Sequence, residues 1–175
     1  MTASQQPTVH VPVHVPVHVR AYADADWDAV ARAHDATRLQ ELRATVGEDA
    51  FLDLAATAEE EGLFDDRVWV AADEDGRVLG FVAYADAEVT WLYVHPDAQR
   101  RGVGRALLRE ALAHADALGV PVVEVTVLDG GPARPLYEGE GFVLHETRTG
   151  ALVGNEAFTA TGHVLLRTRP GEQAG

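Results

Sequence analysis

Apolar and polar positions are most regularly ordered between residues 89 and 118. Residues 89–94 are rich in β-branched and aromatic side chains and end at a His-Pro pair, which is typical of a strand. From Val103 onwards apolar residues recur at helical spacing, while arginines and acidic residues take the other positions. Gly102 and Gly104 separate the two patterns. We therefore predict a strand, a glycine turn and an amphipathic helix here.

The flanking segments predict further strands and helices around this unit. Asp24 or Asp26 can cap the first helix. The expected helices are 27–36, 38–46, 50–61 and 133–138, the expected strands are 68–72, 78–84, 122–127, 142–146 and 163–168, and residues 150–161 are expected to form a loop that covers a site.

The order of these elements predicts the sheet topology. Residues 73–76 (DEDG) indicate a hairpin, so the strands around them are antiparallel. A strand, a crossover helix and a second strand make the pair 89–94 and 122–127 parallel. We predict a single-domain α/β (α+β) fold with a mixed, mostly antiparallel central sheet of about six to seven strands and flanking helices.

The N-terminus repeats a V-H-V-P pattern whose valines would line one face of a strand. Pro12 and Pro16 remove backbone donors on one side, so residues 1–16 are expected to be an edge strand or a leader. His10, His14 and His18 would lie about 13 Å apart in an extended chain, too far to share one ion, and we expect no metal site.

Composition and charge narrow the class of protein. The 175 residues are 47% hydrophobic and 24% charged, without cysteine, which indicates one soluble domain and is compatible with a cytoplasmic location. No apolar run reaches the roughly 20 residues of a membrane span. The net charge of −14 argues against a nucleic-acid partner. The basic residues are all arginines, and four of them lie between positions 100 and 109, which suits a ligand with phosphates.

The glycine turn predicts an anion site. A strand that enters a helix through a glycine turn leaves several backbone N–H groups unpaired at the positive end of the helix dipole. A dinucleotide-binding fold is a rival interpretation, but Leu107 stands where the third glycine of that motif is needed. A P-loop is excluded because its Lys-Ser/Thr pair is missing.

The same residues carry a family resemblance. Residues 99–104 (QRRGVG) fit the Q/R-x-x-G-x-G/A pattern of the GNAT superfamily of N-acetyltransferases, and residues 92–96 (LYVHP) and 136–142 (LYEGEGF) resemble the segments around that pattern. The resemblance covers residues 17–168 in element order and is sharp only over 88–142. It implies an acetyltransferase domain over 17–168, followed by a flexible tail over 169–175.

Acetyl-coenzyme A is the cosubstrate that this resemblance implies. Its pyrophosphate would bind the amides of residues 101–105, and its pantetheine arm would pair with the backbone of Leu92 and Val94, where the strands 89–94 and 122–127 splay apart. The implied binding residues are Leu92, Tyr93, Val94, Gln99, Arg100, Arg101, Gly102, Val103, Gly104, Arg105, Ala133 and Tyr137.

The expected reaction moves an acetyl group to a primary amine of a small molecule or a peptide by direct attack. The resemblance points to Tyr137 as the proton donor to the departing thiolate and to Glu88 as the general base, with Glu124, His95 and His145 as alternatives for the base.

Three questions about function stay open at this level. The acidic residues at 59–61 and 65–66 form either a solvated helix end or one wall of an acceptor pocket. The chain as a whole is either an enzyme or a non-catalytic module that binds acetyl-coenzyme A. Residues 153–158 and the last strand would serve as the interface if the chain forms a homodimer.

Overall fold

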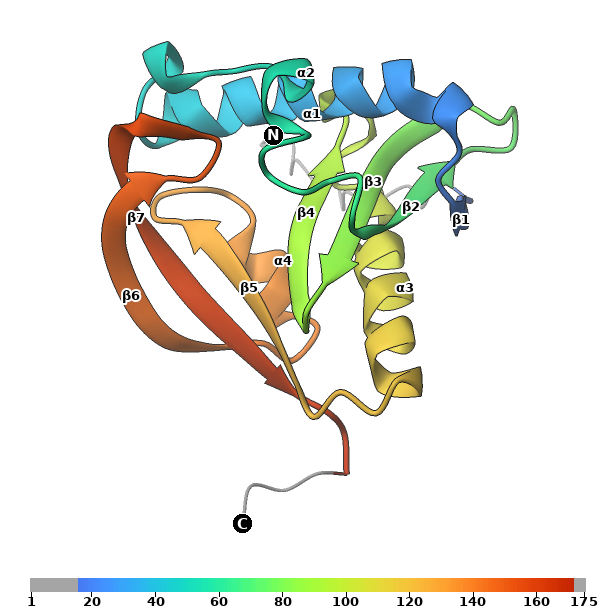
Figure 1. Cartoon of the computed structure of the whole chain (residues 1–175). Coiled ribbons are helices and arrows are strands. Elements are labelled where there is room, and N and C mark those ends of the chain that lie inside the picture. The colour runs from blue at the N-terminus through green and yellow to red at the C-terminus, as the bar shows by residue number, and fades with distance from the viewer. Residues whose placement is uncertain (1–15, 172–175) are drawn as a thin grey trace, which may run out of the picture.

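The computed structural model describes residues 16–171, which form one seven-stranded sheet with helices on both faces (Figure 1). Its elements are β1 His18–Ala21, α1 Trp27–Ala44, α2 Leu54–Thr57, β2 Arg67–Ala72, β3 Val78–Ala85, β4 Glu88–Val94, α3 Val103–Ala117, β5 Val122–Leu128, α4 Arg134–Glu138, β6 Val143–Leu152 and β7 Asn155–Thr168, with short 3-10 turns at Asp24–Asp26, Glu48–Ala50 and Pro96–Ala98. The strand order is β1-β2-β3-β4-β5-β7-β6, and β4–β5 is the parallel pair. The predicted mixed, mostly antiparallel sheet is confirmed.

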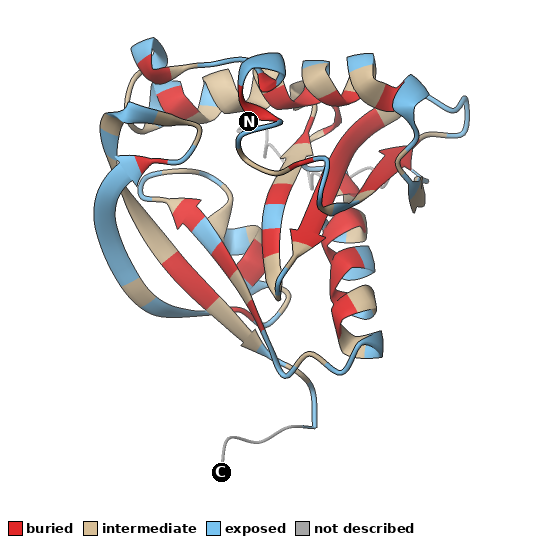
Figure 2. Cartoon of the chain, in the orientation of Figure 1, coloured by how far each residue is buried: buried red, intermediate tan, exposed pale blue. Residues whose placement is uncertain are grey.

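Strands β2, β3 and β4 are covered on both faces, and most of their residues are buried (Figure 2). Trp69 and Val82 pack with α3, whereas Val70 and Phe81 pack with α1. Successive side chains of a strand point to opposite faces, so a strand between two helical layers is apolar at nearly every position. This double burial explains why these strands were predicted within one or two residues of their bounds.

The β6–β7 hairpin differs from the rest of the sheet, because most of β6 is exposed (Figure 2). The predicted loop over residues 150–161 is wrong. Both strands run through it and turn at Val153 and Gly154, where Gly154 has a φ of +83°. The sequence gives little alternation here because neither face of β6 is buried against a helix.

Two of the predicted helices also differ from the structure. α1 is one helix of 18 residues and does not break between residues 36 and 38. No glycine or proline stands at that point, so nothing interrupts its backbone hydrogen bonds. The predicted helix 50–61 shortens to α2, whose first turn is capped by Asp53, which accepts a hydrogen bond from Ala56 N.

At the N-terminus, β1 is an edge strand that pairs with β2. Val17 and Val19 pack against the core, as the alternating pattern predicts. Asp26 precedes α1 but makes no capping hydrogen bond to the helix, because its carboxylate is held by Arg20 at 2.7 Å and by the amide of Ala23. The predictions for residues 1–15 and 172–175 lie outside the described residues.

Within residues 16–171 no helix is both long and apolar enough to span a bilayer. The same part of the chain contains no group of three or more His, Asp or Glu side chains arranged to hold a metal ion.

Candidate functional site

The parallel strands β4 and β5 separate almost as soon as they meet. They pair at Glu88 and Glu124, and the amide of Glu124 also donates to Ala87 O at 2.8 Å. Beyond this point the ladder stops, and the two strands diverge towards their C-terminal ends (Figure 1). The predicted splay between these strands is therefore present.

The backbone of β4 faces this opening at alternate residues. His95 N donates to Leu79 O on β3 at 2.8 Å, and Tyr93 is paired with Phe81. Because backbone groups alternate sides along a strand, the N–H and C=O groups of Leu92 and Val94 point towards β5. They are the groups predicted to pair with a pantetheine arm.

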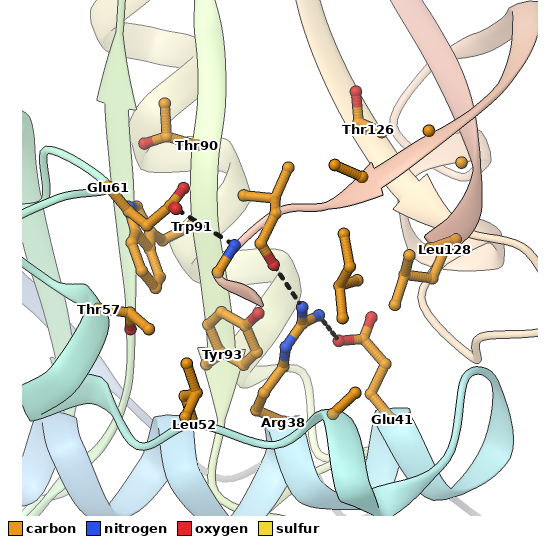
Figure 3. A pocket seen from close by; sticks show the side chains of 18 of the residues that line it. Arg38, Glu41, Leu52, Thr57, Glu61, Thr90, Trp91, Tyr93, Thr126 and Leu128 are labelled. Atoms are coloured by element: carbon orange, nitrogen blue, oxygen red, sulfur yellow. Dashed lines mark hydrogen bonds and ion pairs between the residues drawn. The ribbon is translucent and has the colours of Figure 1, made fainter. Parts of the chain in front are cut away.

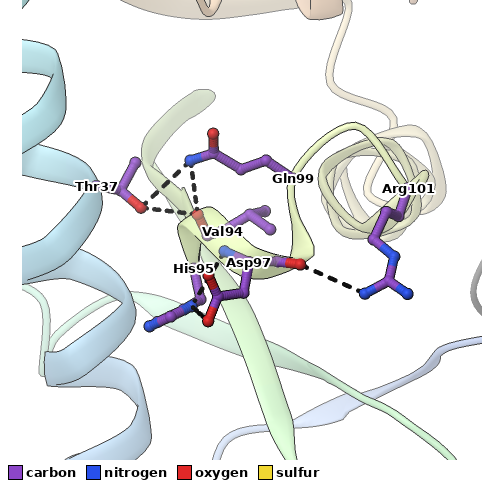
Figure 4. Close-up of polar contacts among 6 residues, drawn as sticks. All are labelled: Thr37, Val94, His95, Asp97, Gln99 and Arg101. Atoms are coloured by element: carbon purple, nitrogen blue, oxygen red, sulfur yellow. Dashed lines mark hydrogen bonds and ion pairs between the residues drawn. The ribbon is translucent and has the colours of Figure 1, made fainter.

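The carbonyl of Val94, however, already has protein partners. It accepts hydrogen bonds from Thr37 Oγ1 at 2.7 Å and from Gln99 Nε2 at 3.0 Å (Figure 4). The Gln99 side chain thus ties the turn after β4 to α1 and does not point its amide at an anion. The carbonyl of Val94 and the side-chain amide of Gln99, two groups at predicted coenzyme-binding positions, are thus hydrogen-bonded within the protein.

The turn between β4 and α3 presents the predicted row of amides. Gly102 adopts φ +89° and ψ −5° directly before α3, a left-handed conformation that glycine tolerates best. The hydrogen bond from Ala106 N to Gly102 O is the first backbone hydrogen bond of α3. Within residues 16–171, the amides of residues 101–105 have no protein acceptor, so they can bind an anion at the N-terminus of α3.

The arginines around this turn are not all available to a ligand. Arg105 Nε lies 3.0 Å from Glu140 Oε1, and Arg109 forms a two-pronged pair with the same carboxylate. Arg101 Nη1 donates to Asp97 O at 3.3 Å (Figure 4). The guanidinium of Arg105 is thus engaged by Glu140, which leaves the predicted contact through its backbone amide.

Gly104 and Val103 serve packing more than was predicted. A Cβ atom at position 104 would lie 3.3 Å from Leu136 Cδ2 and 3.6 Å from Val94 Cγ2. The absent side chain thus lets the first turn of α3 approach β4 and α4. Val103 has its side chain in the core, so only its amide can reach an anion.

Two neighbouring cavities that share lining residues lie along β4. The large cavity, of about 660 Å³, lies between α1, the α2 region, β4, β5 and the β6–β7 hairpin (Figure 3). The narrow cavity, of about 120 Å³, runs beside β4, β5 and α4. Glu41, Val89, Thr90, Tyr93 and Thr126 line both.

Tyr137 lines the narrow cavity, together with Leu92 and Ala133. Its side chain is 5% exposed and meets Phe142 edge-on at a centroid distance of 5.6 Å. Burial, with Tyr93 and Glu41 nearby, raises the pKa of Tyr137 well above its usual value. The phenol therefore stays protonated at neutral pH and is able to donate a proton.

Glu88 lines the large cavity at the closed end of the splay. Burial raises the pKa of its carboxyl above the usual value, and the neighbouring carboxylates of Glu124 and Asp66 raise it further. A carboxylate with a raised pKa is a stronger base than an ordinary surface glutamate.

The sequence analysis missed the contribution of α1 to the large cavity. His34, Arg38 and Glu41 line it from one face of this helix, and Figure 3 shows the side chains of Arg38 and Glu41 there. Their spacing of four and three residues is that of a single helix face, but the predicted break near residue 37 separated them. From the acidic segments at 59–61 and 65–66, Glu61 lines the cavity, while Asp66 accepts a hydrogen bond from Thr90.

Comparison with known proteins finds a domain family whose sequence model matches part of the chain. Residues 64–144 match the sequence model of the acetyltransferase (GNAT) domain. The mycothiol acetyltransferase of Streptomyces coelicolor is 36% identical over 94 residues, which cover 50% of this chain and 30% of the relative. That of Propionibacterium freudenreichii is 41% identical over 81 residues, covering 45% and 23%. The chain thus matches less than a third of these relatives' length.

Solved structures share the whole architecture. A GCN5-related N-acetyltransferase from Rhodopseudomonas palustris superposes with a TM-score of 0.75 at 21% identity, covering 91% of this chain and 99% of the other. A phosphinothricin acetyltransferase from Sinorhizobium meliloti, solved in complex with AcCoA, gives 0.68 at 20% identity, covering 91% and 93%. At these identities the likeness concerns the fold.

Proposed function

We propose that this chain is an N-acetyltransferase of the GNAT superfamily, which transfers the acetyl group of acetyl-coenzyme A to a primary amine; the partial match to the acetyltransferase (GNAT) domain and the shared fold support this. One observation carries the proposal. The strands β4 and β5 part beyond Glu88 and Glu124, and the turn that follows β4 presents a row of amides that have no protein acceptor among the described residues 16–171. A long ligand with a diphosphate at its middle and a thioester at its end matches these two features.

In this proposal the amides of residues 101–105 hold the diphosphate, and Arg100 and Arg101 add positive charge at the surface. The backbone of Leu92 and the N–H of Val94 pair with the pantetheine arm. Ala133 and Tyr137 border the channel that the arm follows. The side chains of Gln99 and Arg105 are left out, because they are engaged within the protein.

The chemistry needs a group that accepts a proton and a group that donates one. Acetyl-coenzyme A supplies an acetyl thioester, whose C–S bond breaks as the C–N bond of the amide forms. Glu88 takes a proton from the attacking amine, directly or through water, and its raised pKa favours that step. Tyr137 donates its phenol proton to the departing thiolate and then regains one from solvent.

The acceptor in this proposal is a small molecule in preference to a peptide. The β6–β7 turn spans the large cavity. The volume of this cavity, about 660 Å³, is that of a typical small-molecule site. The relatives named mycothiol acetyltransferase support a small-molecule acceptor as well.

Thiol release from acetyl-coenzyme A tests this function. The chain is incubated with glucosamine, tyramine, spermidine and alanine amide in turn, and free thiol is followed by its colour reaction. We expect at least one amine to accelerate thiol release and to appear acetylated by mass spectrometry. Tight binding of the coenzyme without any amine-dependent thiol release would favour the alternative, a module that binds acetyl-coenzyme A without catalysis.

We also carry forward the predicted cytoplasmic location and the predicted homodimer. The dimer would use the β6–β7 turn and β7. Light scattering on the intact chain and on a variant with a shortened turn measures the mass directly, and an unchanged monomer mass in both would exclude this dimer.

A further inference from the structure

The turn between β6 and β7 closes one side of the large cavity and forms hydrogen bonds with elements on the opposite side. Arg38 Nη2 donates to Val153 O at 2.9 Å, and Glu61 Oε1 accepts from Gly154 N at 3.2 Å (Figure 3). Next to them, Asn155 Nδ2 donates to Ala50 O at 3.0 Å. The first two contacts hold the backbone of the turn, so its position depends on the side chains of Arg38 and Glu61, and the third ties the side chain of Asn155 to the backbone of Ala50.

Arg38 differs from Glu61 and Asn155 because its guanidinium also contacts other side chains. Its Nη1 donates to Glu41 Oε2 at 2.6 Å, and the two opposite charges compensate each other. The side chains of Arg38 and Glu41 are only 13% and 17% exposed. The phenol of Tyr93 lies beside the same guanidinium (Figure 3). A planar guanidinium holds several acceptors at fixed angles, which a lysine ammonium on a flexible stem does not.

Tyr93 links this arrangement to the reacting centre. It lines both the large and the narrow cavity, and its ring packs against His34 at a centroid distance of 4.7 Å. Tyr137 lies close enough to Tyr93 and Glu41 for their charges to affect its ionisation. The Arg38 guanidinium therefore contacts both the β6–β7 turn over the large cavity and Tyr93, which lines both cavities.

We propose that Arg38 is a positioning residue for acceptor binding, which holds the β6–β7 turn over the large cavity and the hydroxyl of Tyr93, which lines both cavities. The proposal rests on the proposed function and specifies its acceptor side. It predicts that the acceptor, and not the coenzyme, senses a change at position 38.

The test compares Arg38→Lys with Arg43→Lys. Arg43 lies on the same helix and also pairs with a glutamate, Glu48, at 2.7 Å, but it is exposed and lines neither cavity. Both variants keep the charge and the helix propensity of the position. The first measurement is amide hydrogen exchange, which needs no ligand. We expect exchange at residues 152–155 to rise at least about tenfold in Arg38→Lys and to stay unchanged in Arg43→Lys.

The second measurement is kinetic and uses the amine with the highest turnover among the four named above. Arg38→Lys should raise KM for this amine about tenfold or more, while the dissociation constant of coenzyme A stays within about twofold. Unchanged exchange at the turn would overturn the proposal. An equal rise of exchange throughout the sheet, or a parallel loss of coenzyme affinity, would also overturn it by showing general destabilisation.

Two further outcomes allow a failure of the proposal for Arg38 to be distinguished from a failure of the proposed function. If none of the four amines is acetylated, the exchange experiment alone decides the proposal for Arg38. If Arg38→Lys does not fold, the intact chain is measured with and without the best amine. Slower exchange at residues 152–155 in the presence of the amine supports the proposal, and equal exchange contradicts it.

Discussion

The two halves of the proposed site are built in different ways. Most of the coenzyme half is one continuous stretch, from β4 through the glycine turn into α3, and its proposed binding groups are backbone groups. The acceptor half is assembled from α1, the α2 region and the β6–β7 turn, which meet through side chains such as Arg38, 115 positions away from Val153.

This difference has a consequence for specificity. Backbone groups in a local turn are fixed by the conformation of a few residues, so many sequences can supply the same coenzyme site. Contacts between distant elements depend on particular side chains, and a few substitutions are enough to change them. We therefore expect substitutions in the coenzyme half to affect all acceptors equally, and substitutions in the acceptor half to affect acceptors differently.

The largest effect is expected at Tyr137, which borders the coenzyme channel. Tyr137→Phe removes the proposed proton donor but keeps the ring in its contact with Phe142, so turnover should fall about 1,000-fold for every acceptor, with coenzyme affinity within about twofold. Steady-state kinetics and calorimetric titration separate the two quantities.

Tyr84→Phe is the matched control for this variant. Tyr84 is a buried tyrosine on the α3 side, and its hydroxyl has no hydrogen-bond partner within residues 16–171. Turnover should therefore stay unchanged. If Tyr137→Phe is as active as this control, Tyr137 serves only the core.

A smaller effect is expected at the glycine turn itself. Gly102→Val forces a β-branched residue into a left-handed conformation, so the turn must rearrange and its amides lose their alignment. The affinity for coenzyme A should fall about 100-fold, which corresponds to about 2.7 kcal/mol.

Gly119→Val provides the comparison, because Gly119 has a φ of +75° at the opposite end of α3. It should cost a similar amount of stability in a thermal melt but leave coenzyme affinity unchanged. Equal losses of affinity in both variants would mean that strain in α3, and not the amide row, controls binding.

Glu88 should show an intermediate effect that depends on pH. Burial raises the pKa of Glu88 in the folded chain. The turnover rate of the wild type should therefore rise with pH around a midpoint above the ordinary glutamate pKa. Glu88→Gln should remove this limb of the profile and lower turnover about tenfold at pH 7, since water can still carry the proton away.

The same pKa shift affects stability, and the sign follows from linkage. The folded chain binds the Glu88 proton more tightly than the unfolded chain, so ionisation at neutral pH destabilises the fold. Glu88→Gln should therefore melt slightly higher than the wild type at pH 7, by about 1–3 °C, and the gap should close at pH 4. A lower melting temperature at pH 7 would contradict this account of its surroundings.

The smallest effect is expected from Arg100, an exposed arginine beside the amide row. Arg100→Gln should weaken coenzyme A binding about threefold in low salt, because an exposed charge contributes little and is screened. The difference should disappear at high ionic strength. A larger loss that persists in salt would indicate a direct contact in place of a general attraction.

The same comparison explains what the sequence could predict. The strand, the turn and the helix that form most of the coenzyme half were predicted, because they leave local patterns in residues 89–118. The acceptor half was not, since His34, Arg38 and Glu41 form one surface only if α1 runs unbroken.

The hydrogen-bond partners of side chains are the second feature that the sequence could not predict. Gln99 and Arg105 stand at family positions that suggest an anion, but their partners, Val94 O and Glu140, belong to contacts that only the folded chain brings together. Likewise, β6 was predicted too short because its residues are exposed and carry no pattern that burial would impose.

The central claim is that coenzyme A binds to the amides before α3 and along β4. The most direct measurement is a titration with coenzyme A, followed by the backbone amide resonances of the labelled chain. The account predicts saturable shifts concentrated at residues 101–105, Leu92 and Val94, with the β6–β7 turn unaffected. Saturable shifts centred on the large cavity and its turn, with residues 101–105 unchanged, would contradict it.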